Sequence, residues 1–198
     1  MKIETRHINI PEGSFETEFI VYDEQDKSEI KKVFDLWVTL SKNLIKLGST
    51  RIGNFPEGIS EAIFAIEMNA PRCIGSISGA ASSFDNYDFS NNKRIQLKAR
   101  ASTGPTSFGP RSVFDECYLF NMTEIANSSK NQKKFNGNYQ IFKIGSPEVF
   151  HNIILNKKSG ETFLKQQQQG RRPRLDIFKS IVVPRDIKPI KSGNIDDW

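Results

Sequence analysis

The chain has 198 residues, of which 37% are hydrophobic, and a formal net charge of +5. This length can bury one substantial core, so we expect a single α/β domain over residues 1–198, with a mixed central sheet flanked by helices. No apolar run approaches the roughly 20 residues of a membrane-spanning helix, and the polar N-terminus is unlike a signal peptide, so we expect a cytoplasmic protein. Cys73 and Cys117 are widely spaced among apolar neighbours, which indicates buried free thiols in a reducing compartment.

The first 48 residues predict an arm followed by a long helix. Residues 1–25 contain alternating polar and apolar side chains and a turn at Pro11-Glu-Gly, which favours a strand or an N-terminal arm. From Asp26 to Gly48 apolar residues recur at spacings of three and four, as in an amphipathic helix. They are Ile30, Val33, Phe34, Trp37, Leu40, Leu44, Ile45 and Leu47. This pattern predicts a helix that packs in the core or in a dimer interface.

A second helix is expected over residues 56–68, because Pro56 suits a first turn and Pro71 ends the pattern. Its core stripe is Ile59, Ala62, Ile63 and Ile66. Glu57, Glu61, Phe64 and Met68 fall on the opposite face at helical spacing. Either glutamate can therefore point at the hairpin that follows or at bulk water.

The stretch from Ser82 to Arg100 predicts a β-hairpin. Arg94, Gln96, Lys98 and Arg100 alternate with Ile95, Leu97 and Ala99, so one face of a strand is polar and the other apolar. Residues 90–92, Ser-Asn-Asn, suit a tight turn, so residues 84–89 should fold back as the first arm. Asp85 would then lie beside Gln96 and Lys98. We expect the apolar face to pack inward and the polar face to meet a ligand.

The remaining elements are expected in the order loop, strands, helices and a final strand. The loop over residues 102–112 carries hydroxyls and an arginine that can contact phosphates, namely Ser102, Thr106, Ser107 and Arg111. Strands are expected at 72–78, 113–121 and 138–144, with Asp115 and Glu116 on a solvated strand edge. Helices are expected at 147–155 and 161–169, and a last strand at 175–183.

Positive charge is concentrated in residues 157–191, which contain ten Lys or Arg against three acids. Such a segment is typical of a polyanion partner, although a membrane surface or a solvated face gives the same count. Arg171, Arg172 and Arg174 stand between two expected elements, next to Gln168 and Gln169. A fixed guanidinium can pair with guanine or with a phosphate, and both roles remain open here.

The residues of the hairpin resemble the PD-(D/E)XK nuclease superfamily. Asp85, the polar turn and Gln96-Leu-Lys98 are similar to the active-site hairpin of PvuII-like restriction enzymes. The run from Lys98 to Phe120 resembles small type II restriction endonucleases, including the group that cuts at GCNGC. One position departs from the motif, because its second acid is Gln96 here.

This resemblance implies a prokaryotic, Mg²⁺-dependent endonuclease that acts as a homodimer on double-stranded DNA at a short G·C-rich palindrome. Asp85, the Gln96 amide oxygen, the Leu97 carbonyl and Glu61 would hold the metal, and Lys98 would stabilise the developing charge. Arg100, the hydroxyl loop and the basic segment would contact DNA. Two alternatives stay open: a repair or junction-resolving nuclease of the same fold, and a DNA-binding protein whose catalytic site has decayed.

Overall fold

The computed structural model describes residues 1–48, 55–74, 84–101, 103–110, 112–122 and 137–198. Its centre is one curled sheet with strand order β1-β2-β3-β4-β5-β7-β8-β12. These strands are Lys2–Ile10, Gly13–Val21, Arg72–Cys73, Asn86–Asp88, Lys93–Arg100, Glu116–Asn121, Asn138–Gly145 and Lys191–Asn194. β5 and β7 run parallel, and the other neighbouring pairs are antiparallel. The expected mixed sheet within a single α/β domain is therefore confirmed.

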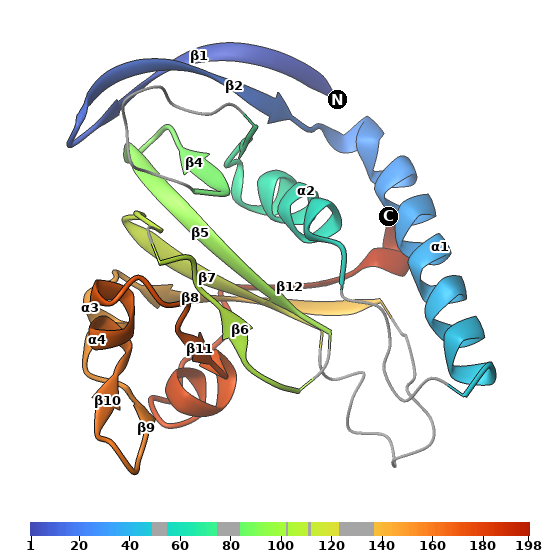
Figure 1. Cartoon of the computed structure of the whole chain (residues 1–198). Coiled ribbons are helices and arrows are strands. Elements are labelled where there is room, and N and C mark those ends of the chain that lie inside the picture. Colours follow the sequence, from blue (N-terminus) through green and yellow to red (C-terminus); the bar gives the residue numbers. More distant parts are fainter. Residues whose placement is uncertain (49–54, 75–83, 102, 111, 123–136) are drawn as a thin grey trace.

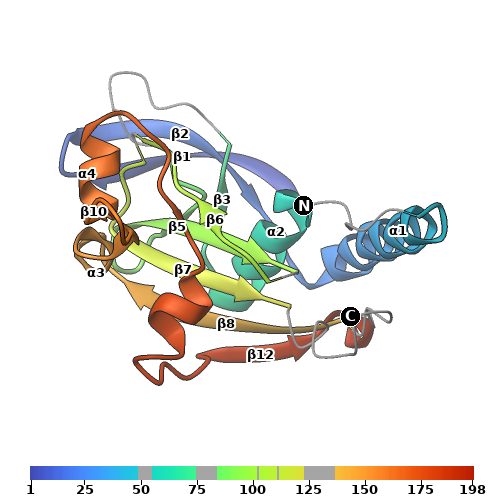
Figure 2. The same ribbon diagram turned by 60° about the horizontal axis from the view of Figure 1, so that its bottom comes forward.

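Two helices cover one face of this sheet (Figure 1). A 3-10 turn at Glu24–Asp26 leads into α1, Lys27–Lys46, and α2 spans Glu57–Met68, so both predicted helices are confirmed. Phe34 and Trp37 of α1 pack with Ile63 of α2 against Leu97 and Phe120 of the sheet. Half of the α1 stripe does not pack in the core of this chain, because Val33, Leu40, Ile45 and Leu47 are exposed, so for these residues only the dimer alternative stays open. α1 lies at the rim of the molecule, where only one of its faces meets the protein core (Figure 2).

The opposite face of the sheet carries a C-terminal lobe, residues 146–190 (Figures 1 and 2). The lobe contains α3, Glu148–His151; β9, Ile154–Asn156; β10, Glu161–Thr162; α4, Phe163–Gln168; β11, Arg174–Leu175; and the π-helical turn η3, Phe178–Val182. Its aromatic core of Phe150 and Phe163 packs on Leu119 and Phe142 of the sheet. A short strand β6, Thr106–Ser107, pairs with β11 and so joins the lobe to the segment after β5. The chain ends in a 3-10 turn, Ile195–Asp197.

Three elements of the lobe and one strand of the sheet differ from those expected from the sequence. The strand expected at 175–183 is wrong beyond Leu175, which ends β11, because the chain then turns into η3. Asp176 accepts the backbone N–H of Lys179 at 3.1 Å, and Ile177 and Ile181 share one buried side. The helix expected at 147–155 ends at His151 and is followed by β9, and the one expected at 161–169 begins with β10. The strand expected at 72–78 is described only as Arg72–Cys73, and residues 75–78 lie outside the described ranges.

Within the described residues, no helix is long and apolar enough to cross a membrane. Cys73 and Cys117 are both free thiols, as expected. Cys117 is buried, whereas Cys73 is only half-buried on the short strand β3. Burial raises the pKa of the Cys117 thiol far above its ordinary range, which favours its unreactive protonated form.

Candidate active site

The hairpin formed by β4 and β5 places an aspartate beside a glutamine and a lysine. Asp88 accepts the backbone N–H groups of Ser90 and Asn91 at 2.8 and 3.2 Å, and Asn92 adopts a left-handed φ of 52°, so the polar turn closes as predicted. Asn86 pairs with Ile95, and the Asp85 N–H donates to the Ile95 carbonyl at 2.8 Å. The predicted hairpin is therefore confirmed, and Asp85 lies next to the second half of β5.

The Asp85 carboxylate is held by two donors from β5. The Leu97 N–H donates to Asp85 Oδ2 at 2.6 Å, and the Gln96 side-chain amide donates to the same oxygen. Among the described residues no donor reaches Asp85 Oδ1. Burial raises the pKa of Asp85, and the Lys98 charge and these two hydrogen bonds oppose that rise. Within the described part of the chain, one oxygen of this partly desolvated carboxylate thus has no hydrogen-bond donor.

The second carboxylate comes from α2. Glu61 is 8% exposed, and burial together with the negative charge of Asp85 raises its pKa to about 7. The Arg72 guanidinium at the start of β3 pairs with Glu61 and opposes that rise. Glu57 is exposed in the first turn of the helix, and its negative charge also acts on Asp85 and Glu61, so both glutamates lie near the hairpin and Glu61 is the buried one.

Arg72 was not anticipated from the sequence. It is a single cation at the start of a two-residue strand, and only its position just after the Pro71 that ends the helix pattern could have drawn notice. Its contact with Glu61 depends on how the end of α2 folds back onto β3. In the structure Arg72 partly neutralises a site that otherwise holds two mutually repelling carboxylates.

Lys98 lies one position beyond Leu97, and its side chain points to the lobe face of the sheet. It is half-buried, and its Nζ lies 5.2 Å from the centre of the Phe108 ring, which is fully buried. An ammonium over an aromatic face is attracted by the ring quadrupole. Phe108 therefore packs against the Lys98 ammonium on the lobe side of the sheet. The charge of Lys98 opposes the rise in the pKa of Asp85.

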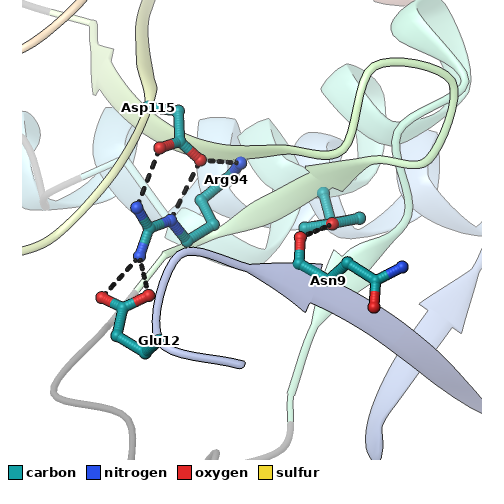
Figure 3. Close-up of polar contacts among 5 residues, drawn as sticks. Asn9, Glu12, Arg94 and Asp115 are labelled. Carbon is teal, nitrogen blue, oxygen red and sulfur yellow. Dashed lines mark hydrogen bonds and ion pairs between the residues drawn. The ribbon is translucent and has the colours of Figure 1, made fainter. Parts of the chain in front are cut away.

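The expectation that the whole polar face of β5 meets a ligand was wrong for both arginines. Arg94 is 4% exposed and lies between Asp115 and Glu12, which bind its guanidinium at 2.8 to 3.0 Å (Figure 3). Arg100 is 6% exposed; its Nη1 contacts Asp176 Oδ1 at 2.8 Å, and its guanidinium stacks on Phe178. Asp115 was expected on a solvated edge, and it instead lies against a buried cation. Both arginines face acids because buried charges need partners.

The expected DNA-contacting residues are distributed over the lobe and the segment after β5. Thr106 and Ser107 lie on β6, where Arg174 pairs with Ser107. Gln168, Gln169, Arg172 and Arg174 are exposed, whereas Arg171 forms an ion pair with Glu161. Ser102 and Arg111 lie outside the described residues. The structure thus brings the end of the basic segment beside the hydroxyl-bearing strand.

The donors around Asp85 suit a hard divalent cation. Among the described residues, no three or more His, Cys, Asp or Glu gather in a group that could hold a metal ion. Mg²⁺ requires fewer, since one or two carboxylates with carbonyl oxygens and waters complete its shell. In a strand the N–H and C=O of one residue point to the same edge, so the Leu97 carbonyl lies on the Asp85 side. Asp85, Glu61, Leu97 and the Gln96 amide oxygen therefore fit such an ion.

A comparison with protein families identifies the family of the chain. Residues 22–184 match the family described as Bsp6I restriction endonuclease. The chain belongs to this family. The matched part includes the hairpin from Asp85 to Lys98, α2 and the basic residues up to Arg174. The resemblance to type II restriction endonucleases is therefore confirmed.

A curated relative agrees with this family membership. The chain is 29% identical over 176 residues to the type II restriction enzyme Bsp6I of Bacillus sp. (strain RFL6). The aligned region covers 87% of this chain and 90% of the relative. No solved structure matches the chain. The family match thus covers five of the eight strands of the sheet, both long helices and most of the lobe; the five strands are β3, β4, β5, β7 and β8.

Proposed function

We propose that this member of the restriction endonuclease family hydrolyses phosphodiester bonds of double-stranded DNA with Mg²⁺ at a short G·C-rich palindromic site. The observation that carries the proposal is the hairpin in which Asp85, Gln96 and Lys98 meet within a chain of this family. The G·C-rich target follows from the resemblance to enzymes that cut at GCNGC.

The proposed chemistry assigns a role to each residue. Asp85 and Glu61 supply charged oxygens for the metal, and the Leu97 carbonyl and the Gln96 amide oxygen supply neutral ones. When bound, Mg²⁺ neutralises charge on the phosphate and makes its water more acidic. Gln96 also keeps Asp85 oriented through the hydrogen bond from its amide nitrogen. Lys98 stabilises the negative charge that grows on the scissile phosphate, because its ammonium lies close enough to act on the same carboxylate.

Cation binding would also offset the electrostatic cost of ionising the buried carboxylates in the metal-free site. Burial and the charge of Asp85 raise the pKa of Glu61, and Arg72 offsets this rise only in part. Burial and the charge of Glu57 raise the pKa of Asp85. A divalent ion held by these carboxylates would favour their charged forms. In this proposal Glu61 from the helix would compensate for the acid that is missing at Gln96.

The decisive experiment is digestion of phage DNA with Mg²⁺ by the wild-type protein and by three variants. We expect discrete fragments from wild type, and at least a thousandfold slower cutting by Asp85→Asn, Lys98→Met and Glu61→Gln, with DNA affinity and melting temperature close to wild type. Asp88→Asn is the matched control, because Asp88 lies on the same hairpin and only caps the turn. Wild-type rates in the Asp85 variant would refute the site, and cutting confined to branched DNA would favour a junction-resolving nuclease. Tight binding without cutting would favour the decayed site.

We also propose that the enzyme acts as a homodimer joined through α1. Val33, Leu36, Leu40 and Leu47 lie on one side of the helix and are 49, 69, 55 and 84% exposed. A contiguous exposed apolar stripe of this kind is typical of a protein interface. A second copy is the occupant that the proposed function requires, since two-fold protein symmetry matches a palindrome cut on both strands. The N-terminal arm is the other surface expected to take this role.

A further inference from the structure

A hollow in the C-terminal lobe gathers four cations. It has a volume of about 510 Å³ and opens between β9, α4 and the chain that leads into β11. Its walls include four positively charged side chains and two amides, namely Lys157, Lys158, Arg172, Arg174, Asn156 and Gln166. All four cations are exposed. Residues separated by up to 18 positions in the sequence thus build one positively charged concavity.

The four cations have no acidic partner among the described residues, in contrast to a neighbouring arginine. Arg171 pairs with Glu161, and Gln166 Nε2 donates to the other Glu161 oxygen at 2.8 Å. Glu161 is therefore already paired within the protein, and its hydrogen bonds with Gln166 and Arg171 lower its pKa. Among the described residues the four cations of the hollow have no such partner, whereas the adjacent Arg171 is paired although its side chain is 48% exposed.

The shape and charge of the hollow suit a sugar-phosphate backbone. Reading base edges in the major groove needs a protruding helix or β-ribbon, whereas a hollow receives the convex backbone. Lysine ammonium groups bind phosphate as point charges, and amide side chains can donate to phosphate oxygens as well. We propose that this hollow binds backbone phosphates of duplex DNA, with Arg172 and Arg174 gripping phosphate and Arg171 acting as an internal partner. The inference rests on the proposed nuclease function and adds the place where the substrate backbone is held.

The hollow is connected to the catalytic lysine through hydrogen-bonded backbone. Arg174 pairs with Ser107 across β11 and β6, and the Phe108 N–H donates to the Pro173 carbonyl at 3.0 Å. Phe108 in turn lies against the Lys98 ammonium. DNA bound in the hollow would therefore be held in a fixed position relative to β6 and Phe108, which pack against the proposed active site. The hollow should set affinity and position, and it should not take part in the chemical step.

The test measures binding of a 20-base-pair duplex of arbitrary sequence by fluorescence anisotropy, in EDTA, over a range of salt concentrations. Sequence-independent binding reports phosphate contacts, and each lost contact lowers the log–log salt slope by about 0.9. We expect Lys157→Ala, Arg172→Ala and Arg174→Ala each to lower the slope by about that amount and to weaken binding roughly fivefold near 0.15 M salt. Arg171→Ala is the matched control, because it removes the same charge one residue away but from an internal pair, and its slope should stay near wild type.

Four outcomes are informative. Equal effects of Arg171→Ala and Arg172→Ala would show that only the overall charge matters and would overturn the hollow. Losses confined to cleavable sequences, with arbitrary duplex bound as by wild type, would assign the arginines to bases and also overturn it. If the wild-type protein cuts phage DNA but the hollow variants match the control in salt slope and affinity, only this inference fails. If the wild-type protein neither binds nor cuts duplex DNA, the proposed function fails as well.

Discussion

Replacing Asp115 should destabilise the protein far more than replacing Glu12, although both carboxylates bind the same guanidinium. Asp115 accepts the Arg94 Nε and Nη2 groups at 3.0 and 2.8 Å and also the Arg94 backbone N–H at 2.8 Å. Glu12 accepts only Nη1, at 3.0 Å from each oxygen. The side-chain exposures are 5% for Arg94, 21% for Asp115 and 34% for Glu12. The contact with Asp115 is therefore the less solvated of the two.

These exposures set the expected magnitudes. Removing one partner of a buried ion pair costs about 3 to 5 kcal/mol, and we expect about 3 for Asp115→Ala because Glu12 remains as a partial partner. Glu12→Ala should cost about 1 kcal/mol, since water reaches this side of the pair. At this chain length these values correspond to falls in Tm of roughly 6 to 12 °C and 2 to 4 °C. Urea denaturation in EDTA measures both free energies of unfolding.

Arg94→Met tests the same reasoning from the other side. It removes the buried charge and leaves two carboxylates that can reach water, so it should cost less than Asp115→Ala. Adding Asp115→Ala to Arg94→Met should then change the free energy of unfolding by less than about 1 kcal/mol, which gives a coupling near 2 kcal/mol. Equal costs for Asp115→Ala and Glu12→Ala, or additive effects in the double variant, would refute the reasoning.

The stabilisation by Asp115 should also depend on pH. Burial acts to raise the pKa of Asp115, but the Arg94 hydrogen bonds and charge outweigh burial and hold the pKa below its ordinary 3.8. A carboxyl whose folded-state pKa is depressed stabilises the fold above its unfolded-state pKa and loses this effect as pH falls through the folded-state pKa. The stability gap between wild type and Asp115→Asn should therefore be constant near neutral pH and should shrink below pH 3.8.

Two further predictions concern the metal shell and the dimer. Gln96→Glu restores a charged oxygen and should retain cleavage. Gln96→Ala should slow Mg²⁺-dependent cutting at least tenfold, because it removes both a proposed ligand and the donor that holds Asp85. Equal rates for the two variants would contradict this. Leu36→Lys combined with Leu40→Lys should convert a dimer to a monomer in sedimentation velocity, while Val183→Lys, at an apolar residue that is 60% exposed elsewhere, should not; an unchanged dimer would move the interface to the N-terminal arm.

Short-range patterns in the sequence determined the hairpin and both long helices. The hairpin follows from alternation in β5 and from a turn whose Asp88 side chain bonds the next backbone groups, so all its determinants lie within about 15 residues. The two helices follow from spacings of three and four between cap residues. Asp85, Gln96 and Lys98 could be named as a site because local strand geometry alone brings them together.

The tertiary structure decided which of the charges on β5 are buried against charges of opposite sign. Alternation placed Arg94 on the same polar face as Lys98, but Glu12, 82 residues away, and Asp115, 21 residues away, turned it into a buried ion pair. Periodicity likewise could not show that α1 buries one side only, or that residues 175–183 do not form one continuous strand. A sequence pattern reports which side chains share a face, and only long-range packing determines what that face meets.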